Sequence, residues 1–295
     1  RNKSTISREL RRNGSGIYDV YLAHKAQGRA SIRKQESGQR PRLKDKRIKR
    51  YVIRKLKAGW SPEQISGDLK QNHPDMNISH EAIYQFVYAK ETLKTVNLKS
   101  YLPRANRIRR PRGHSRKHKK ISIPRRVSID DRPKYIDKRK QTGHWESDTM
   151  ISGVSKASLV VALERATRYV KLAKIKAKQA REVSNAINRR LGRMPKSARR
   201  TITYDNGSEN VEHERINKAL GTTSYFCNPY HSWEKGSVEN AVGLVRRFLP
   251  KKTNIAKITK EQIRKIENRL NHRPRKCLNF KTPYQLFTSS VALPG

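Results

Sequence analysis

The stretch HWESDTMISGVSKASLVVALERATRYVKLAKIK, residues 144–176, decides the fold of this chain. It divides into three short runs of strand-forming residues, at 144–153, 158–167 and 168–176, and a tight turn separates the last two. Short apolar runs that are bounded by turn residues predict β-strands. We therefore expect three consecutive strands that pair as an antiparallel meander.

Helical and extended segments alternate after this meander. Apolar residues recur three and four positions apart in the helical segments, whereas the extended segments are short apolar runs that stop at turns. We expect helices at 178–192, 209–219, 236–249 and 259–271, the last of these being the final helix, and strands at 199–207 and 222–229. This element order predicts an α/β RNase H-like domain at 141–295, with the fold of retroviral integrase cores.

The segment STISRELRR, residues 4–12, predicts an amphipathic helix that Ser4 caps. Small polar residues followed by arginines suit a recognition helix, which presents its first residues to base edges. A plain basic surface helix is the alternative. Because the chain starts at Arg1 inside this helix, we assign residues 1–40 to a partial N-terminal helix-turn-helix with a basic arm and expect further residues before it. The candidate DNA contacts are Ser7, Arg8, Arg11 and Arg12.

A second helix-turn-helix is expected within residues 41–100. A basic helix at 45–57 precedes the run SPEQ at 61–64, where a capping Ser, a Pro and an acid mark a helix start. Pro74 breaks this helix, and Ser79 caps the next one. A helical hairpin that only packs is the alternative. The candidate DNA contacts of this unit are Ser79, His80, Tyr84 and Gln85.

Residues 101–140 are expected to form a basic linker. Its first part, 101–120, holds nine basic residues and no acidic one, and its Pro and Gly residues disfavour regular structure. Such a segment is expected to follow a phosphate backbone or a groove. The candidate contacts are Arg107, Arg109, Arg110, Arg112 and Lys117.

The whole chain is strongly basic, with 69 Lys and Arg against 24 Asp and Glu and a formal net charge of +45 over 295 residues. Residues 1–140 carry +27 and residues 141–295 carry +18, so both parts are expected to face a polyanion, and nucleic acid fits best. A membrane partner is disfavoured, since no apolar run approaches the ~20 residues that cross a bilayer. Cys227 and Cys277 lack metal-site spacing and predict reduced thiols in a cytoplasmic protein.

Two aspartates stand out in the basic C-terminal half. Asp148 and Asp205 are its only aspartates, and each falls at or near the end of a predicted strand. Carboxylates are the hard oxygen ligands that Mg²⁺ prefers. Aspartates that only make turns or ion pairs are the alternative, because Asp205 also opens the strong turn sequence DNG.

Glu239 is the third candidate acid. It lies on the expected helix at 236–249, with 33 residues between it and Asp205. Glu146 shares a strand face with Asp148 and is the rival ligand or a supporting residue. Three carboxylates can hold two Mg²⁺ ions, or Mn²⁺ in their place, ~4 Å apart for in-line phosphoryl displacement. Asp148 would bridge the two ions, Asp205 would hold one and Glu239 the other.

Six segments carry recognisable motifs: STISRELRRN (4–13), GWSPEQISGDL (59–69), HWESDTM (144–150), TYDNGSEN (203–210), PYHSWEKGSVENAVGLVRRFLPKKTN (229–254) and NHRPRKCLNFKTPYQLF (271–287). Together they resemble the IS-thirty family of bacterial insertion-sequence transposases. The resemblance implies Mg²⁺-dependent DNA cleavage and strand transfer by an integrase-like core whose catalytic, metal-binding residues are Asp148, Asp205 and Glu239. It also implies helix-turn-helix binding of terminal inverted repeats, and a homodimer or higher homo-oligomer that holds two DNA ends.

Other residues in the matching motifs are expected to support the active site. Asn206, Gly207 and Asn240 lie beside the three acids in these motifs. His231 and Trp233 are expected to line the site or its DNA path, and core packing is the alternative for Trp233. The residues that follow the third acid and are expected to contact phosphates are Arg246, Arg247, Lys251 and Lys252.

Two other functions remain open on the sequence. A non-catalytic DNA-binding regulator would use the C-terminal half for dimerisation, and it would need neither Asp148 nor Asp205. A different nuclease could also use the RNase H-like fold, which hosts many chemistries. The two helical DNA-binding units and the basic linker favour site-specific transposition over unspecific hydrolysis.

Overall fold

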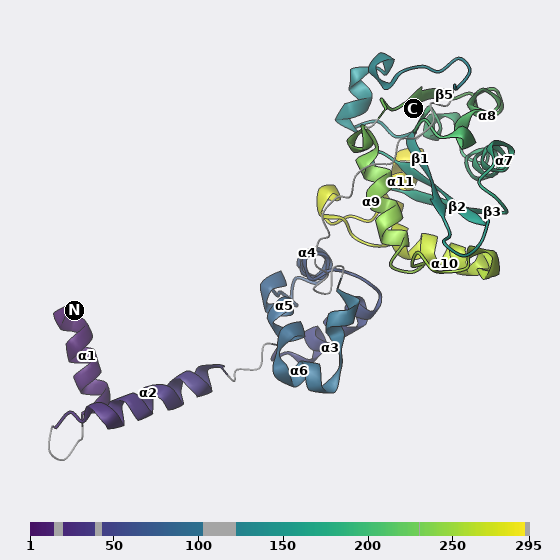
Figure 1. The fold of residues 1–295 in the computed structure, drawn as a ribbon. Helices are drawn as coiled ribbons and strands as arrows, with labels where there is room; N and C mark the ends of the chain where they lie inside the picture. The colour runs from purple at the N-terminus through teal and green to yellow at the C-terminus, as the bar shows by residue number, and fades with distance from the viewer. Residues whose placement is uncertain (15–19, 39–42, 103–121, 230, 293–295) are drawn as a thin grey trace.

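A computed structural model describes residues 1–14, 20–38, 43–102, 122–229 and 231–292 (Figure 1). The described elements form three groups along the chain, which are two N-terminal helices, a cluster of helices and an α/β unit. Among these residues, no helix is both long enough and apolar enough to cross a bilayer.

A five-stranded sheet forms the centre of the α/β unit. Its strands are β1 (His144–Ile151), β2 (Ser158–Glu164), β3 (Val170–Ile175), β4 (Thr201–Tyr204) and β5 (Thr223–Phe226). They lie in the order β3-β2-β1-β4-β5. The first three strands are antiparallel, whereas β4 runs parallel to β1 and β5 runs parallel to β4. The expected meander and the integrase-like fold are confirmed.

Helices cover both faces of this sheet (Figure 1). On one face, α7 (Ala180–Leu191) and α8 (His213–Leu220) pack over an apolar layer that includes Trp145. On the other face, α9 (Gly236–Val245) and α10 (Lys260–Asn271) pack over a second apolar layer. Because both faces are covered, every residue of β2 is buried.

The chain continues beyond α10 into α11 (Pro283–Ala292), so the expectation that 259–271 is the final helix is wrong. Thr282 begins α11, because its hydroxyl accepts a hydrogen bond from the Gln285 amide at 3.2 Å. Phe287 then packs into the layer below α7 and stacks on Tyr169 with ring centroids 4.3 Å apart. The Thr-Pro pair at 282–283 is a helix-start signal that identifies this element.

The second part of the expected linker, residues 122–140, folds against the sheet. Its short helices η2 (Ile129–Asp131) and η3 (Lys134–Lys138) bury Ile129 and Ile136, and Ser128 forms a parallel bridge with Phe226. The apolar residues at 123, 129 and 136 therefore extend the α/β unit beyond the edge strand β5.

The helical cluster contains α3 (Lys46–Lys57), α4 (Pro62–Asn72), α5 (His80–Tyr88) and α6 (Lys90–Thr95). Ser61 begins α4 with a capping box, and the Ser79 hydroxyl accepts from the Ala82 amide, so both helix starts are confirmed. The cluster contacts the α/β unit, because Arg247 donates to the carbonyls of Gly59 and Tyr101 at 3.0 and 2.8 Å.

The N-terminal pair consists of α1 (Lys3–Asn13) and α2 (Ala23–Gly38). Asn2, rather than the expected Ser4, caps α1, since its side chain accepts from the Ser4 amide at 3.0 Å. A regular helix also stands where a basic arm is expected. Ile6 and Leu10 of α1 remain about half exposed (50% and 48%).

Gly143 fixes the junction of β1 and β4 because its carbonyl accepts from the amides of Arg200 and Thr201. Both Gly143 and Gly221 have positive φ, but only a Cβ at Gly143 would clash, at 2.5 Å from the Ser197 carbonyl oxygen. We expect Gly143→Ala to lower the unfolding free energy by about 2–4 kcal/mol and Gly221→Ala by about 1 kcal/mol. Urea unfolding measures both, and equal losses would contradict the importance of this close approach.

Candidate active site

The two aspartates of the C-terminal half lie side by side at one end of the sheet. β1 and β4 are parallel neighbours, with Glu146 opposite Thr203, so two residues further along Asp148 is level with Asp205. The side chain of Asp148 is 25% exposed and that of Asp205 is 43% exposed. Topology thus places two carboxylates together where solvent and substrate can reach them.

A lysine side chain bridges these two carboxylates. The Lys235 Nζ atom lies 3.5 Å from Asp148 Oδ1 and 3.2 Å from Asp205 Oδ2, and it donates to the Ser147 carbonyl at 3.3 Å. Burial by itself lowers the pKa of Lys235, but the carboxylates of Asp205 and Asp148 outweigh it, so the pKa is raised. The space between the aspartates therefore holds a full positive charge.

Neighbouring amides hold both aspartates in place. The Asn210 amide donates to Asp205 Oδ1 at 2.8 Å and to the Asp205 carbonyl at 3.2 Å. The backbone amide of Thr149 donates to Asp148 Oδ1 at 2.9 Å. Asn210 and Lys235 were not among the expected site residues. Their signal in the sequence is only that they lie in the motifs at 203–210 and 229–254.

Asn206 and Gly207 shape the turn after β4 rather than face the carboxylate pair. The Asn206 amide donates to the Cys227 carbonyl at 2.8 Å, and its oxygen accepts from Arg126 Nε at 2.9 Å. A Cβ at Gly207 would lie 2.3 Å from an oxygen of the buried Glu209. A side chain at 207 would therefore displace the Glu209 carboxylate, and both Asn206 and Gly207 support the position of Asp205 through the backbone.

Glu239 lies on α9 and is exposed. It makes no side-chain hydrogen bond or ion pair with the residues that the structure describes. Within those same residues, no three His, Cys, Asp or Glu side chains gather into a metal-binding group. The structure brings Asp148 and Asp205 together but does not add Glu239 to them.

Glu146 is fully buried and connects β1 to the start of α9. Its Oε1 lies 3.1 Å from Arg165 Nε, and its Oε2 accepts from the Val238 amide at 3.0 Å. A carboxylate at the N-terminus of a helix also interacts favourably with the helix dipole. Of the two expected roles, this arrangement favours support over metal ligation.

Known transposases resemble this chain along nearly its whole length. It is 35% identical over 302 residues to the transposase InsI of the element IS30A from Escherichia coli (strain K12), covering 99% of this chain and 77% of that protein. It is 38% identical over 290 residues to the transposase of IS4351 from Bacteroides fragilis, covering 98% and 87%. The transposase of IS1086 from Cupriavidus metallidurans is 35% identical, with coverage of 100% and 88%. The chain belongs to the IS-thirty family of insertion-sequence transposases.

The family model of the integrase core domain matches residues 138–232, which include Asp148 and Asp205. The expected function is confirmed: the transposase is an enzyme that cleaves and transfers DNA strands through an integrase-type core. Neither the non-catalytic regulator nor a different nuclease on the RNase H-like fold is supported by these relatives. Enzymes with this core use divalent metal ions.

His231 and Trp233 of the transposase stack on each other beside the short helix η6 (Ser232–Lys235), with ring centroids 4.3 Å apart. Trp233 is 69% exposed, so core packing does not account for it. His231 Nδ1 lies 3.1 Å from Glu234 Oε1, and Glu234 also accepts from the Asn228 amide. An exposed aromatic pair directly before Lys235 remains a predicted part of the DNA path.

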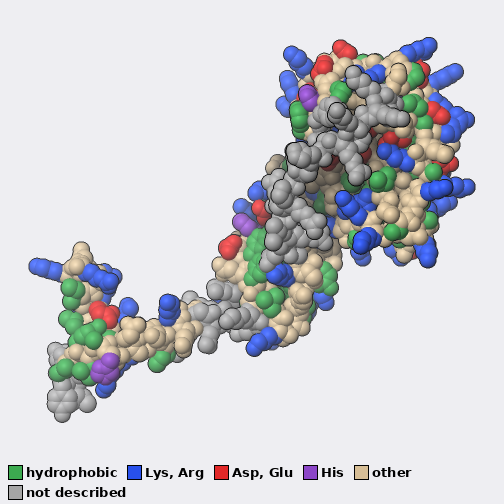
Figure 2. Space-filling view, in the orientation of Figure 1, with side chains coloured by type: hydrophobic (Ala, Val, Ile, Leu, Met, Phe, Trp, Pro, Cys, Tyr) green, Lys and Arg blue, Asp and Glu red, His purple; other side chains and the backbone are tan. Residues whose placement is uncertain are grey.

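The expected DNA contacts of the helical units lie on exposed surfaces or help build the helices. Ser7, Arg8, Arg11 and Arg12 are exposed on α1. His80 and Gln85 are exposed on α5, whereas Tyr84 packs partly against the core of the cluster. The contacts expected at Arg107, Arg109, Arg110, Arg112 and Lys117 lie outside the described residues. Figure 2 shows Lys and Arg side chains over the α/β unit and on α1.

Two of the four basic residues that follow Glu239 have partners within the transposase. Arg246 donates to the Ile151 carbonyl at 2.6 Å, and Arg247 joins α9 to the helical cluster. Lys251 and Lys252 are exposed, so they are accessible to DNA. Phosphate contact by these four residues remains a prediction.

Replacing Lys235 tests whether the aspartate pair needs a cation. Without the ammonium, two adjacent carboxylates repel each other, so we expect Lys235→Ala to lose about 1–3 kcal/mol of stability in EDTA. A divalent cation should restore more stability to this variant than to the wild type. Thermal melts with EDTA and with Mn²⁺ measure this, and Lys171→Ala, which breaks the contact to Glu267, is the control. Identical Mn²⁺ responses would contradict a cation site between the aspartates.

Proposed function

We propose that this transposase cuts DNA at the ends of its insertion element and joins the 3′ ends to target DNA at the Asp148–Asp205 pair, with two Mg²⁺ ions. The observation that carries this is the Lys235 ammonium held by both carboxylates at 3.2–3.5 Å. The position between the two aspartates already holds one cation, and both side chains are partly open to solvent. Their carboxylate oxygens are the donors that Mg²⁺ prefers. The residues present therefore fit the ions, and Mn²⁺ should substitute.

When bound, divalent ions stabilise the attacking and leaving oxygens of an in-line phosphoryl displacement. Residues of the chain fix the carboxylates that would hold these ions. Asp148 is fixed by β1 and by the Thr149 amide, and Asp205 is fixed by Asn210. Glu146 holds the first turn of α9 against β1, so the helix that carries Glu239 stays next to the aspartates.

Glu239 can complete the set through a local movement at the start of α9. Lys235 is the last residue of η6 and directly precedes α9, and Glu239 lies in the first turn of that helix. Gly236 lies between them, and a Cβ there would meet nothing within 4 Å. We infer that withdrawal of the Lys235 ammonium and approach of the Glu239 carboxylate are one rearrangement, which leaves three acids around the metal position.

The basic surface supports the recognition steps of this proposal. A net charge of +45 suits long contacts with the DNA backbone, and α1 and α5 carry the residues proposed to read the terminal inverted repeats. Joining two element ends to one target requires two active sites, which favours a homodimer or a higher homo-oligomer. The bacterial cytoplasm, in association with the nucleoid, is the compartment in which this substrate is found.

Conservative replacement of the three acids tests the assignment. We expect Asp148→Asn, Asp205→Asn and Glu239→Gln each to lower strand transfer by at least about a hundredfold, because a neutral amide cannot replace a metal-binding carboxylate. DNA affinity in EDTA should change little. The assay uses labelled duplexes with the terminal sequences of the transposase's own element, and Glu261→Gln on α10 is the matched control. Wild-type transfer by Asp205→Asn would refute the assignment.

Salt dependence tests the extent of phosphate contact. If six to ten phosphates are neutralised, we expect DNA affinity to fall by about 10³–10⁵ between 50 and 200 mM salt. Fluorescence anisotropy with one labelled duplex over a salt series measures this slope. An affinity that does not respond to salt would contradict broad contact with the backbone.

A further inference from the structure

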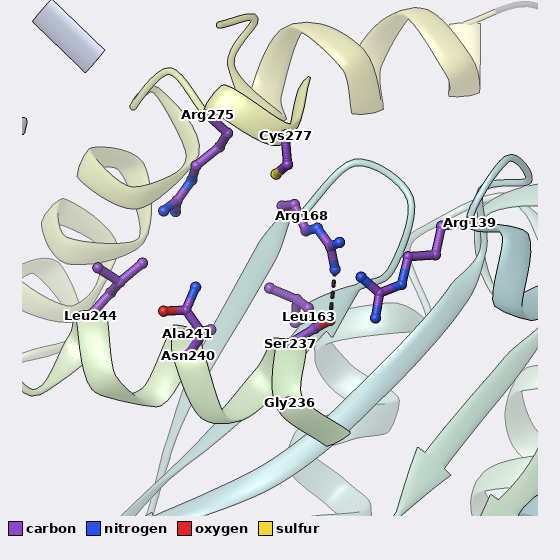
Figure 3. A pocket seen from close by; sticks show the side chains of 10 residues that line it. All are labelled: Arg139, Leu163, Arg168, Gly236, Ser237, Asn240, Ala241, Leu244, Arg275 and Cys277. Atoms are coloured by element: carbon purple, nitrogen blue, oxygen red, sulfur yellow. Dashed lines mark hydrogen bonds between the residues drawn. The ribbon is translucent and has the colours of Figure 1, made fainter. Parts of the chain in front are cut away.

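A cavity of about 280 Å³ lies beside α9 and is separate from the carboxylate pair (Figure 3). Three arginines from different segments reach it: Arg139 follows η3, Arg168 precedes β3, and Arg275 follows α10. We call this cavity the arginine pocket. Its lining residues are Arg139, Leu163, Arg168, Gly236, Ser237, Asn240, Ala241, Leu244, Arg275 and Cys277.

The arginine pocket lies on the side of α9 that faces away from Glu239. Ser237, Asn240 and Leu244 line it, and their spacing of three and four residues defines one helix face. Glu239 lies two residues after Ser237, which is roughly 200° around the helix, and so points away from this face. Asn240, expected beside the acids, thus faces a second site on the same helix.

Positive charge in the arginine pocket is not balanced locally. None of its described lining residues is acidic. Two carboxylates outside the lining attract Arg139, but both are also paired with other arginines, because Asp137 binds Arg132 and Arg165 at 2.6 and 3.1 Å and Glu146 binds Arg165. Burial, followed by repulsion from Arg168, lowers the pKa of Arg139. Burial also lowers the pKa of Arg275 to about 10, and Arg168 adds to this effect.

Several guanidinium donors in the pocket lack partners. Arg168 Nη1 donates to the Ser237 hydroxyl at 2.7 Å, and Arg275 Nη2 donates to the Leu270 carbonyl at 3.3 Å. The buried Nε of Arg275 has no acceptor, and Arg139 makes no side-chain bond to the described residues. A buried donor without a partner is costly, so the Nε of Arg275, together with two further guanidinium groups beside the same cavity, indicates an anionic ligand.

The backbone also holds two of these arginines in an uncommon conformation. Arg139 and Arg168 have φ values of 54° and 62°, in the left-handed region that side chains other than Gly rarely adopt. Arg139 is the C-cap of η3 and Arg168 lies in the connection between β2 and β3, so the local turns fix where both side chains start. In Figure 3 the guanidinium groups of both residues converge near Ser237.

We propose that the arginine pocket binds one phosphodiester phosphate of the DNA backbone and so anchors the start of α9 on DNA from the side opposite the catalytic acids. Guanidinium groups match phosphate oxygens in shape and charge, and the Ser237 hydroxyl and Asn240 amide can add neutral donors. This assignment rests on the proposed action on DNA. A free phosphate ion has the same chemistry, and the experiment below separates the two sources.

Cys277 provides a direct probe of occupancy. It lines the arginine pocket and is exposed, whereas Cys227, the other cysteine of the chain, is buried. We expect a short DNA duplex in EDTA to slow maleimide labelling of Cys277 several-fold. Protection by the duplex, with or without protection by inorganic phosphate, supports the proposal. Protection by inorganic phosphate alone, or by neither ligand, overturns it.

Variants distinguish the pocket from general shielding by DNA. Arg139→Gln/Arg168→Gln and Asn240→Asp should each abolish protection of Cys277, and thermal melts establish that they fold. Arg193→Gln, an exposed arginine after α7 on the other face of the sheet, should retain protection. Protection that survives in both pocket variants overturns the proposal.

The salt slope of DNA binding counts the phosphates lost. Replacing Arg139 and Arg168 together should reduce the slope of log affinity against log salt by about 0.9, which corresponds to one phosphate. If the two arginines contacted separate phosphates, the slope would fall by about 1.8. A slope that is unchanged or falls by the larger amount overturns the shared pocket. Because both measurements use EDTA and need no cleavage, failure of the metal-site proposal leaves them interpretable.

Discussion

The contact of the Lys235 ammonium with Asp148 and Asp205 is the interaction on which the active-site end of this transposase depends. Parallel pairing of β1 and β4 places two carboxylates side by side, and such a pair requires a positive charge between them. A lysine from the chain supplies that charge in the described structure. The Mg²⁺ ions that we propose for this position would have to take the place of the lysine ammonium.

Helix α9 connects the separate parts of the transposase. Its first turn is held to β1 by Glu146, and one face lines the arginine pocket while Glu239 lies on the other side. Beyond its C-terminus, Arg247 bonds to two carbonyls of the helical cluster. A shift at the start of α9 would therefore move Glu239, the arginine pocket and the contact with the helical cluster together. In our proposals, this couples DNA binding in the pocket to the approach of Glu239.

The sequence predicted the sheet and the aspartate pair because both follow from local patterns. Strand-forming runs and turns defined the meander, and the two lone aspartates at strand ends needed only parallel pairing to meet. Lys235 could not be predicted from the sequence, because its role depends on a contact with residues far away in the chain. The same holds for Arg139, Arg168 and Arg275, which no periodicity brings together. Helix α11 was missed although Thr282 and Pro283 form a helix-start signal. Asn2 replaced Ser4 as the cap because both residues can cap a helix and they lie only two positions apart.

The most direct measurement is an anomalous difference map from crystals of the DNA-bound transposase soaked in Mn²⁺. We expect a peak between the carboxylates of Asp148 and Asp205, with Lys235 Nζ withdrawn from both and Glu239 turned toward the metal. A map in which Lys235 still bridges the two aspartates while manganese binds elsewhere would contradict the central claim that this pair forms the catalytic metal site.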